Sequence, residues 1–505
     1  MIELGALPLT LDDVVRVARE REPVRLGAAA RVQMARSRAV VETVVREGRA
    51  VYGVTTGFGE LKERRIPEEQ VRRLQINLLR SHCAGVGPPA GRDVVRVMLL
   101  LRAASLARGF SGCRPELVEG LLALLERDVT PVVPLKGSVG ASGDLAPLAH
   151  LASVLTGEGE AWLEDQRMPA ALALRGAGLQ PLELEAKEGL ALINGTQLST
   201  ALLALACADG RRVWEAGVAV AALSTEVLLA SIRPAGEAVQ ALRPYRGALE
   251  AARRVRAYAA ESALVASHAN CGRVQDAYSL RCVPQVMGAT WDALDHVERQ
   301  LEIEINSVND NPLVFADSGD VVSAGLFHAQ PVALAADYLK IAVAEVASMS
   351  ERRIDRLLDA RESELPPVLA AEPGLESGFM MAQYTAAALV SENKVLAHPA
   401  SVDSIPTGSG LEDHVSMAPI AARHARDVVE NAAWVVALEL LCACRALEFR
   451  RPLTAGSGSE RLYGAVRRLV PAPDGDRPLS DACETVARWV LSRAPERLAE
   501  EVLNA

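Results

Sequence analysis

The sequence predicts a mainly α-helical protein: a bundle of long helices with a loop-rich N-terminal part and minor β-hairpins. Long stretches rich in Ala, Leu, Arg and Glu carry apolar residues at helical spacing. Aromatic residues make up only 4% of the 505 residues, so the core must be built from Ala, Leu and Val. Segments typical of strands are few and short.

The expected elements follow in order along the chain. Several expected helices are longer than usual, and long, Ala-rich helices imply close packing in a bundle. Two hairpins are expected, one from 161–163 with 166–169 and one from 312–315 with 320–323. The expected helices are 28–48, 67–80, 92–108, 114–127, 196–232, 284–305, 329–358, 376–396 and 419–448.

A change in composition divides the chain near residue 205. Residues 1–205 are interrupted more often by Gly and Pro, whereas residues 206–505 hold most of the long helices and a smaller helical tail. We therefore expect an N-terminal part of residues 1–205 and a long-helix bundle of residues 206–505.

Charge and composition exclude several classes of partner. The net charge is −10, from 54 Lys and Arg against 64 Asp and Glu, and no basic block suggests a nucleic-acid partner. The most apolar stretches, 218–232 and 432–444, contain Glu226 and Glu439 and are too short to span a bilayer, so we expect core helices and no membrane partner. The eight cysteines form no CxxC pair, and the first residues lack the pattern of a secretory signal. These features predict a cytoplasmic protein.

Four polar, Gly-rich segments interrupt the helices. Loops so far apart in sequence can converge at one end of a bundle, where helical enzymes build their sites. The histidines show neither HxxxH nor HExxH spacing, so no metal site is expected. The four segments are 51–60 (VYGVTTGFGE), 137–147 (GSVGASGDLAP), 193–197 (INGTQ) and 407–417 (TGSGLEDHVSM).

The segment 137–147 carries the most specific chemical signal. It lacks the GK[ST] of a phosphate loop, and no clear strand–turn–helix unit surrounds it. In a tightly bent loop, the unhindered nitrogen of Gly143 can attack the carbonyl carbon of Ala141. Loss of water there, and again from Ser142, would give a methylidene-imidazolone ring, an electrophile made without an external cofactor.

The segment Gly140-Ala-Ser-Gly-Asp-Leu-Ala-Pro-Leu-Ala-His150 resembles the signature of the aromatic amino acid ammonia-lyases. The resemblance implies one unit of that family overall, a carbon–nitrogen lyase of the EC 4.3.1 type acting on a small amino acid. It also implies 4-methylidene-imidazol-5-one formed from Ala141, Ser142 and Gly143, and a homotetramer whose active sites combine residues from different subunits. Five further segments match in the same order: 52–59, 188–197, 274–282, 309–313 and 401–407.

The resemblance also implies catalytic and binding roles, and the chemistry of the side chains agrees with them. Tyr52 is the expected general base, since a positioned phenol can accept a proton once its neighbours assist deprotonation. Tyr278 is expected to donate to the ring or to help move the proton. Arg281 is the expected clamp for the substrate carboxylate, because its planar fork matches two oxygens.

Three further residues are expected in the pocket on the same grounds. Asn194 would support the electrophile or the substrate by hydrogen bonding. Gln275 and Phe327 are carried over by resemblance as additional pocket residues. Read without the resemblance, Asn194 is equally consistent with a helix cap.

Two features resemble the histidine-specific members of the family. His82, in the Ser81-His82 pair, and Glu412 provide partners for the nitrogens of an imidazole. The expected reaction is the non-oxidative conversion of L-histidine to trans-urocanate and ammonia, which opens histidine degradation.

Other readings stay open on the sequence. Leu411 and Thr55 depart from the usual histidine-specific pattern, which keeps tyrosine or phenylalanine ammonia-lyase, or an aminomutase of the same family, as the alternative. A catalytically silent scaffold and a fumarase-type lyase fit less well: the set of site residues is complete, and the Gly-Ser-Ser signature of the fumarase type is missing.

Overall fold

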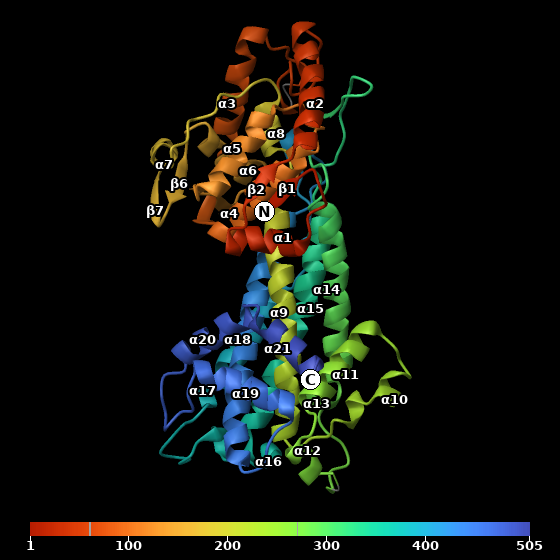
Figure 1. The fold of residues 1–505 in the computed structure, drawn as a ribbon, viewed down its shortest axis with the longest axis vertical. Helices are drawn as coiled ribbons and strands as arrows, with labels where there is room; N and C mark the ends of the chain where they lie inside the picture. The colour runs from red at the N-terminus through yellow and green to blue at the C-terminus, as the bar shows by residue number, and fades with distance from the viewer. Residues whose placement is uncertain (60–61, 270) are drawn as a thin grey trace. The chain divides into compact units, whose positions relative to one another are not determined.

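The computed structural model describes residues 1–59, 62–269 and 271–505, and it confirms the prediction of a mainly α-helical protein (Figure 1). The strands are only two to four residues long and form small separate sheets. Glu60, the last residue of the first predicted loop, lies outside the described residues.

The chain forms two compact units. Unit one comprises Met1–Leu205, Glu298–Asp337 and Pro399–Arg423, and unit two comprises Ala206–Val297, Tyr338–His398 and His424–Ala505. The later segments Glu298–Asp337 and Pro399–Arg423 therefore pack with the N-terminal part of the chain. The expected division into domains at 205/206 stays a prediction.

Unit one contains the small sheets and several helices packed around them. The two predicted hairpins are confirmed: β6 (Glu160–Leu163) pairs antiparallel with β7 (Gln166–Pro169), and β8 (Leu313–Phe315) pairs with β9 (Asp320–Val322). The helices that matter for the site are α2 (Ala28–Arg46), α3 (Val71–His82), α4 (Arg92–Ala107), α5 (Pro115–Glu126), α6 (Leu145–Leu155) and α8 (Glu188–Ile193).

Two of these helices were not expected from the sequence. In α6, Pro147 falls in the first turn, where its missing N–H breaks no helical hydrogen bond, so the proline is tolerated there. Helix α8 has only six residues, all buried, and is too short to show a helical period. It matters for the site described below because Asn194 follows directly after its last residue.

The long helices begin and end for local reasons. Helix α9 (Gln197–Val227) stops before the predicted end at 232, because Leu229 adopts a left-handed φ of 52° that ends the helix. Helix α17 (Met380–Leu396) starts later than predicted, after Gly378 with φ 55°. The other long helices are α14 (Val283–Glu304), α15 (Gln330–Leu358) and α18 (Ala418–Arg450).

The core of unit two is apolar but contains a buried ion pair. Arg353 of α15 donates to both carboxylate oxygens of Glu439 of α18, at 2.5 and 2.8 Å, and both side chains are fully buried. Ser224 and Ser350 also donate to Glu439. This part of α18 is therefore buried in the core, as predicted. The Glu439 carboxylate accepts hydrogen bonds from four donor atoms, which compensates for its burial.

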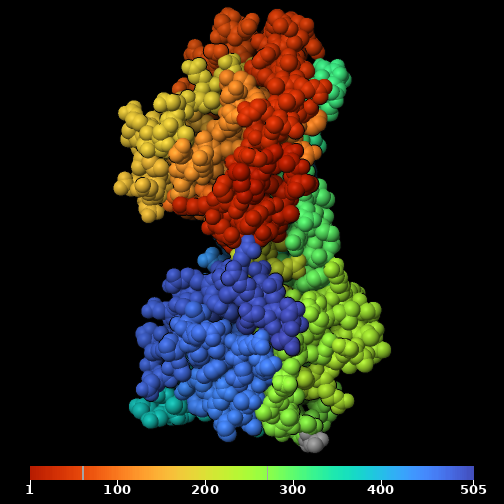
Figure 2. All heavy atoms as spheres, in the orientation of Figure 1, coloured from red at the N-terminus to blue at the C-terminus, as the bar shows by residue number. Residues whose placement is uncertain are grey.

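The segment Glu188–Val227 is long and apolar enough to cross a membrane by composition, but its most apolar window is entirely buried inside the protein. It is therefore a core segment, as predicted for the apolar stretch that follows residue 218. The C-terminal helices α19 (Ser457–Leu469), α20 (Ser480–Val490) and α21 (Ala494–Leu503) form the predicted helical tail and lie on the face of unit two shown in Figure 2.

Candidate active site

Unit one contains a cavity of about 650 Å³ where the four predicted loops converge. Side chains from segments far apart in the sequence line it. Seven residues predicted for the site share this cavity: Tyr52, His82, Ala141, Ser142, Asn194, Phe327 and Glu412.

The Ala141–Gly143 loop is bent tightly just before α6. Gly143 has a φ of 76°, and a Cβ at this position would stand 2.3 Å from the carbonyl oxygen of Gly195. Only glycine fits there without displacing backbone. The Asn194 Nδ2 donates to the Ser142 carbonyl at 2.8 Å. The tight bend and the missing side chain fit the ring closure expected at this tripeptide.

Asp144 links this loop to the start of α9 through hydrogen bonds. Its backbone N–H donates to Gly195 O at 2.7 Å, and its carboxylate accepts from Ser199 N at 2.8 Å and from Ser199 Oγ at 3.0 Å. The side chain is fully buried. Burial raises the pKa of the Asp144 carboxyl to about 6, although the hydrogen bonds from Ser199 act in the opposite direction.

Asn194 ends α8 and is held from behind by a buried arginine. The Arg102 Nη1 donates to Asn194 O at 3.1 Å, to Gln197 Oε1 at 3.1 Å and to Asn309 O at 2.9 Å. Asn194 itself is 3% exposed, and its Oδ1 has no hydrogen-bond partner among the described residues. It therefore keeps a free acceptor while its amide nitrogen holds the Ser142 carbonyl.

Glu412 lies directly against the Ala141–Gly143 loop. The Ser142 Oγ donates to Glu412 Oε1 at 2.7 Å, and Thr407 Oγ1 donates to Oε2 at 2.6 Å. A short backbone bridge joins Thr407 and Glu412 as well. The carboxylate is thus oriented toward Ser142 as a hydrogen-bond acceptor.

His82, the last residue of α3, offers a second acceptor. Its Nδ1 lies 2.9 Å from Leu78 O, and since a carbonyl only accepts, Nδ1 carries the hydrogen and Nε2 is left as an acceptor. Burial lowers the pKa of His82 below its usual range and outweighs the opposing effect of Glu412. Burial therefore favours the neutral form of the ring.

Tyr52 lies in the first Gly-rich loop. Its ring meets Phe58 edge to face, with centroids 6.3 Å apart, and its hydroxyl accepts from Gly59 N at 3.4 Å. Gly53, with φ 67°, packs so closely on Leu190 of α8 that a Cβ would stand 2.4 Å from it. The phenol therefore lies against Phe58 and Gly59, and its loop packs on Leu190.

Three predicted site residues belong to unit two, and none lines the cavity of unit one. The Arg281 guanidinium stacks 4.5 Å over the ring of Tyr278. Tyr278 is 71% exposed, and Gln275 is exposed too. The Arg281 Nε is buried without a hydrogen-bond partner among the described residues.

Sequence reasoning missed several residues of the cavity wall. Leu78 precedes His82 by one helical turn, and Leu190 precedes Asn194 by one turn, so helical spacing could have identified both. His328 and His414 also line the cavity; their rings are nearly parallel with centroids 5.9 Å apart, and His328 Nε2 lies 3.1 Å from His414 O. No local sequence signal predicts that pairing. Within residues 1–59, 62–269 and 271–505, no group of three potential metal ligands is found.

Known proteins are similar to this chain in both sequence and fold. The family model described as aromatic amino acid lyase matches residues 9–468. A protein of Gloeobacter violaceus named histidine ammonia-lyase is 54% identical over 96% of this chain and 94% of its own length. The crystal structure of histidine ammonia-lyase from Trypanosoma cruzi covers 99% of this chain and 95% of its own, with 39% identity and a TM-score of 0.92. Tyrosine aminomutase from Streptomyces globisporus covers 99% and 98%, with 37% identity and a TM-score of 0.93.

Proposed function

Because this chain belongs to the aromatic amino acid lyase family, we propose that it removes ammonia non-oxidatively from L-histidine, giving trans-urocanate and opening histidine degradation. The relatives named histidine ammonia-lyase match nearly the whole chain. One observation carries the proposal: Ser142 contacts Glu412 and Asn194 in a cavity that His82 and Tyr52 also line.

The electrophile is proposed to form from the chain itself. The Gly143 nitrogen bonds to the Ala141 carbonyl carbon, and the Ala141 oxygen leaves as water with the amide hydrogens of Gly143 and Ser142. A second water takes the Ser142 hydroxyl and the Ser142 Cα hydrogen. The left-handed Gly143 and the Asn194 bond to the Ser142 carbonyl support this closure. The methylidene-imidazolone would supply an electrophilic carbon that turns the substrate amine into a leaving group.

Two residues are proposed to hold the substrate imidazole. Neutral His82 presents Nε2 as an acceptor, and Glu412 presents a carboxylate oriented by Thr407. Together they suit a ring whose nitrogens carry hydrogens, whereas an apolar phenyl ring would leave both acceptors unpaired.

Tyr52 is proposed as the general base that accepts the β-proton. Its phenol lines the same cavity as Ser142, and its contacts with Phe58 and Gly59 hold it in place. Proton transfer by a positioned side chain needs this kind of fixed geometry. Phe327 contributes an apolar wall of the cavity.

We propose a homotetramer in which Gln275, Tyr278 and Arg281 complete a site of another copy. Tyr278 is exposed and available to a neighbouring chain. Exposed apolar residues follow one another on α15 (Leu334, Tyr338, Ile341) and on α17 (Met380, Met381, Tyr384), which is typical of faces covered by another copy. The location is proposed to be the cytoplasm, since the eight cysteines form no disulfide framework.

Substrate preference is tested by a direct comparison. The purified protein is given L-histidine, L-tyrosine or L-phenylalanine at equal concentrations, and products are separated and identified. We expect urocanate from histidine to form fastest. If a β-amino acid, or the deamination product of tyrosine or phenylalanine, dominates instead, the histidine assignment is wrong and the aminomutase or tyrosine/phenylalanine alternative replaces it.

A further inference from the structure

A buried glutamine joins the helix that carries His82 to the helix that carries Asn194. Gln75 lies on α3 and is fully buried, and it is the polar member of the buried face formed with Val71, Leu78 and Leu79. Its Oε1 accepts from Gly189 N at 2.9 Å and from Leu190 N at 3.4 Å.

These two amides belong to the first turn of α8, where backbone N–H groups have no partner inside the helix. Lys187, which precedes α8, caps no amide with its own side chain. Gln75 therefore supplies from α3 the cap that α8 lacks. The Gln75 Nε2 has no partner among the described residues, so the oxygen alone makes the contact.

The two helices lie very close together at this point. A Cβ on Gly189 would stand 2.8 Å from the Gln75 carbonyl oxygen and 3.1 Å from the Gln75 Cα. Glycine is required here because of the neighbouring backbone: its own φ is not left-handed. The hydrogen bonds and the missing Cβ together fix how α3 crosses α8.

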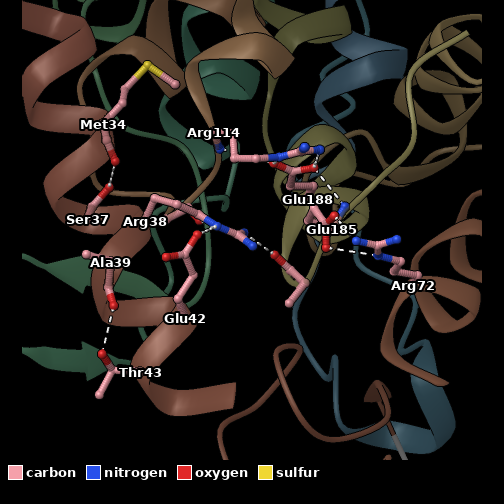
Figure 3. Close-up of polar contacts among 12 residues, drawn as sticks. Met34, Ser37, Arg38, Ala39, Glu42, Thr43, Arg72, Arg114, Glu185 and Glu188 are labelled. Atoms are coloured by element: carbon pink, nitrogen blue, oxygen red, sulfur yellow. Dashed lines mark hydrogen bonds and ion pairs between the residues drawn. The ribbon is translucent and has the colours of Figure 1, made fainter. Parts of the chain in front are cut away.

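Helix α8 is itself anchored independently of α3. Glu188 is fully buried, and the Arg114 guanidinium donates hydrogen bonds to both of its carboxylate oxygens, at 2.9 and 2.8 Å (Figure 3). Lys187 forms a fully buried ion pair with Asp310 at 2.8 Å. Because α8 is held by these pairs, the Gln75 contact, together with the ion pair between Arg72 of α3 and Glu185, sets where α3 lies against it.

The position of α3 determines the position of His82. His82 lies seven residues after Gln75, on the same side of the helix, and its ring is tied to the α3 backbone through Leu78 O. Asn194, at the far end of α8, is tied to Ser142. A shift of α3 against α8 would therefore change the distance from His82 to the Ala141–Gly143 loop.

We propose that Gln75 is a positioning residue for substrate recognition: by capping α8 from α3, it sets the distance between the imidazole-reading His82 and Asn194. This inference rests on the proposed function, because it presumes that His82 binds the substrate ring. It assigns Gln75 no contact with the substrate.

The test compares three variants with the wild-type chain. Gln75→Leu removes the acceptor. Gln75→Glu keeps an oxygen that can accept from the same two amides. Gly189→Ala inserts a Cβ against Gln75, although alanine would favour the helix by itself. Ser37→Ala is the control, since it removes a buried bond from Ser37 Oγ to Met34 O inside α2 (Figure 3).

The readouts are KM and kcat for L-histidine, with kcat normalised to the fraction of chains whose intact mass lacks two waters. We expect Gln75→Leu and Gly189→Ala to raise KM about tenfold or more, because small misplacements of binding groups are costly. Gln75→Glu should restore the wild-type KM, and Ser37→Ala should leave it unchanged. A purely structural role would lower the active fraction without moving KM.

Three results separate failure of this inference from failure of the proposed function. If the wild-type chain turns over histidine but Gln75→Leu and Gly189→Ala keep its KM, the positioning role is wrong while the proposed function stands. If Gln75→Glu behaves like Gln75→Leu, the oxygen cap is not the determinant, and the inference is also overturned. If the wild-type chain does not turn over histidine, the proposed function itself fails.

Discussion

Replacement of Glu412 by glutamine tests the proposed substrate through a single side chain of the cavity. Gln keeps the size of the side chain and an oxygen that Ser142 Oγ can reach before ring closure, as Glu412 Oε1 does at 2.7 Å, so the ring should form as in the wild type. It removes the negative charge that we propose faces the substrate imidazole. A hydrogen bond to a charged group contributes about 1.5–3 kcal/mol, and each 1.4 kcal/mol is about tenfold. We therefore expect kcat/KM for L-histidine to fall about 10- to 150-fold.

The assay follows urocanate absorbance over a range of histidine concentrations. Asp403→Asn is the matched control, because it removes the same charge from an exposed residue outside the cavity whose carboxylate contacts the neighbouring Ser404 N–H. The mass deficit of two waters should be equal in both variants. A kcat/KM for Glu412→Gln that equals the control would refute the role of Glu412 in reading the imidazole.

Three other predictions concern catalysis, pH and stability. Tyr52→Phe should keep the two-water deficit but lower kcat about 100-fold or more, as expected for loss of a general base, and a loss under tenfold would remove Tyr52 from that role. The folded-state pKa of Asp144, about 6, lies above its ordinary value of 3.8, so its protonated form favours the folded state and this contribution is lost as pH rises through 6. Thermal midpoints measured from pH 4 to 7 should therefore vary less with pH in Asp144→Asn than in the wild type, and equal slopes would contradict the buried titration. Glu439→Gln should leave the fully buried Arg353 without its counter-charge and destabilise the protein by about 3–5 kcal/mol, seen as a lower midpoint of thermal unfolding; an unchanged midpoint would show that the pair is not needed.

The long helices could be predicted because periodicity over many residues determines them. Helix α9 and the hairpin of β8 and β9 both follow from patterns within one segment. The end of α9 was misjudged, since the apolar pattern continues past Leu229 while the backbone there turns left-handed. The end of a helix depends on single residues, and hydrophobic periodicity does not indicate where that end lies.

The residues that share the site could be predicted, whereas the contacts between them could not. The resemblance grouped Tyr52, His82, Asn194 and Glu412, and the structure brings these four into one cavity. The contacts of Asn194 and Glu412 with Ser142 depend on how distant loops meet, which no local pattern encodes. The resemblance also named Tyr278, which unit two carries on an exposed surface.

The supporting residues were missed because burial of polar groups is a tertiary property. Gln75 looks like an ordinary helix residue in the sequence, and its function as a cap depends on α8 crossing beside it. Arg102 likewise looks like a surface arginine, yet it is fully buried and donates to three oxygens behind Asn194. Such residues can be identified only once their partners are known.

The central claim is that Ser142 becomes part of an electrophile that deaminates histidine. The most direct measurement combines the intact mass of the purified chain with urocanate absorbance on L-histidine, for the wild type and for Ser142→Ala. We predict a wild-type mass short by two waters and urocanate formation, both lost in Ser142→Ala. A wild-type chain of full mass that forms no urocanate would contradict the account.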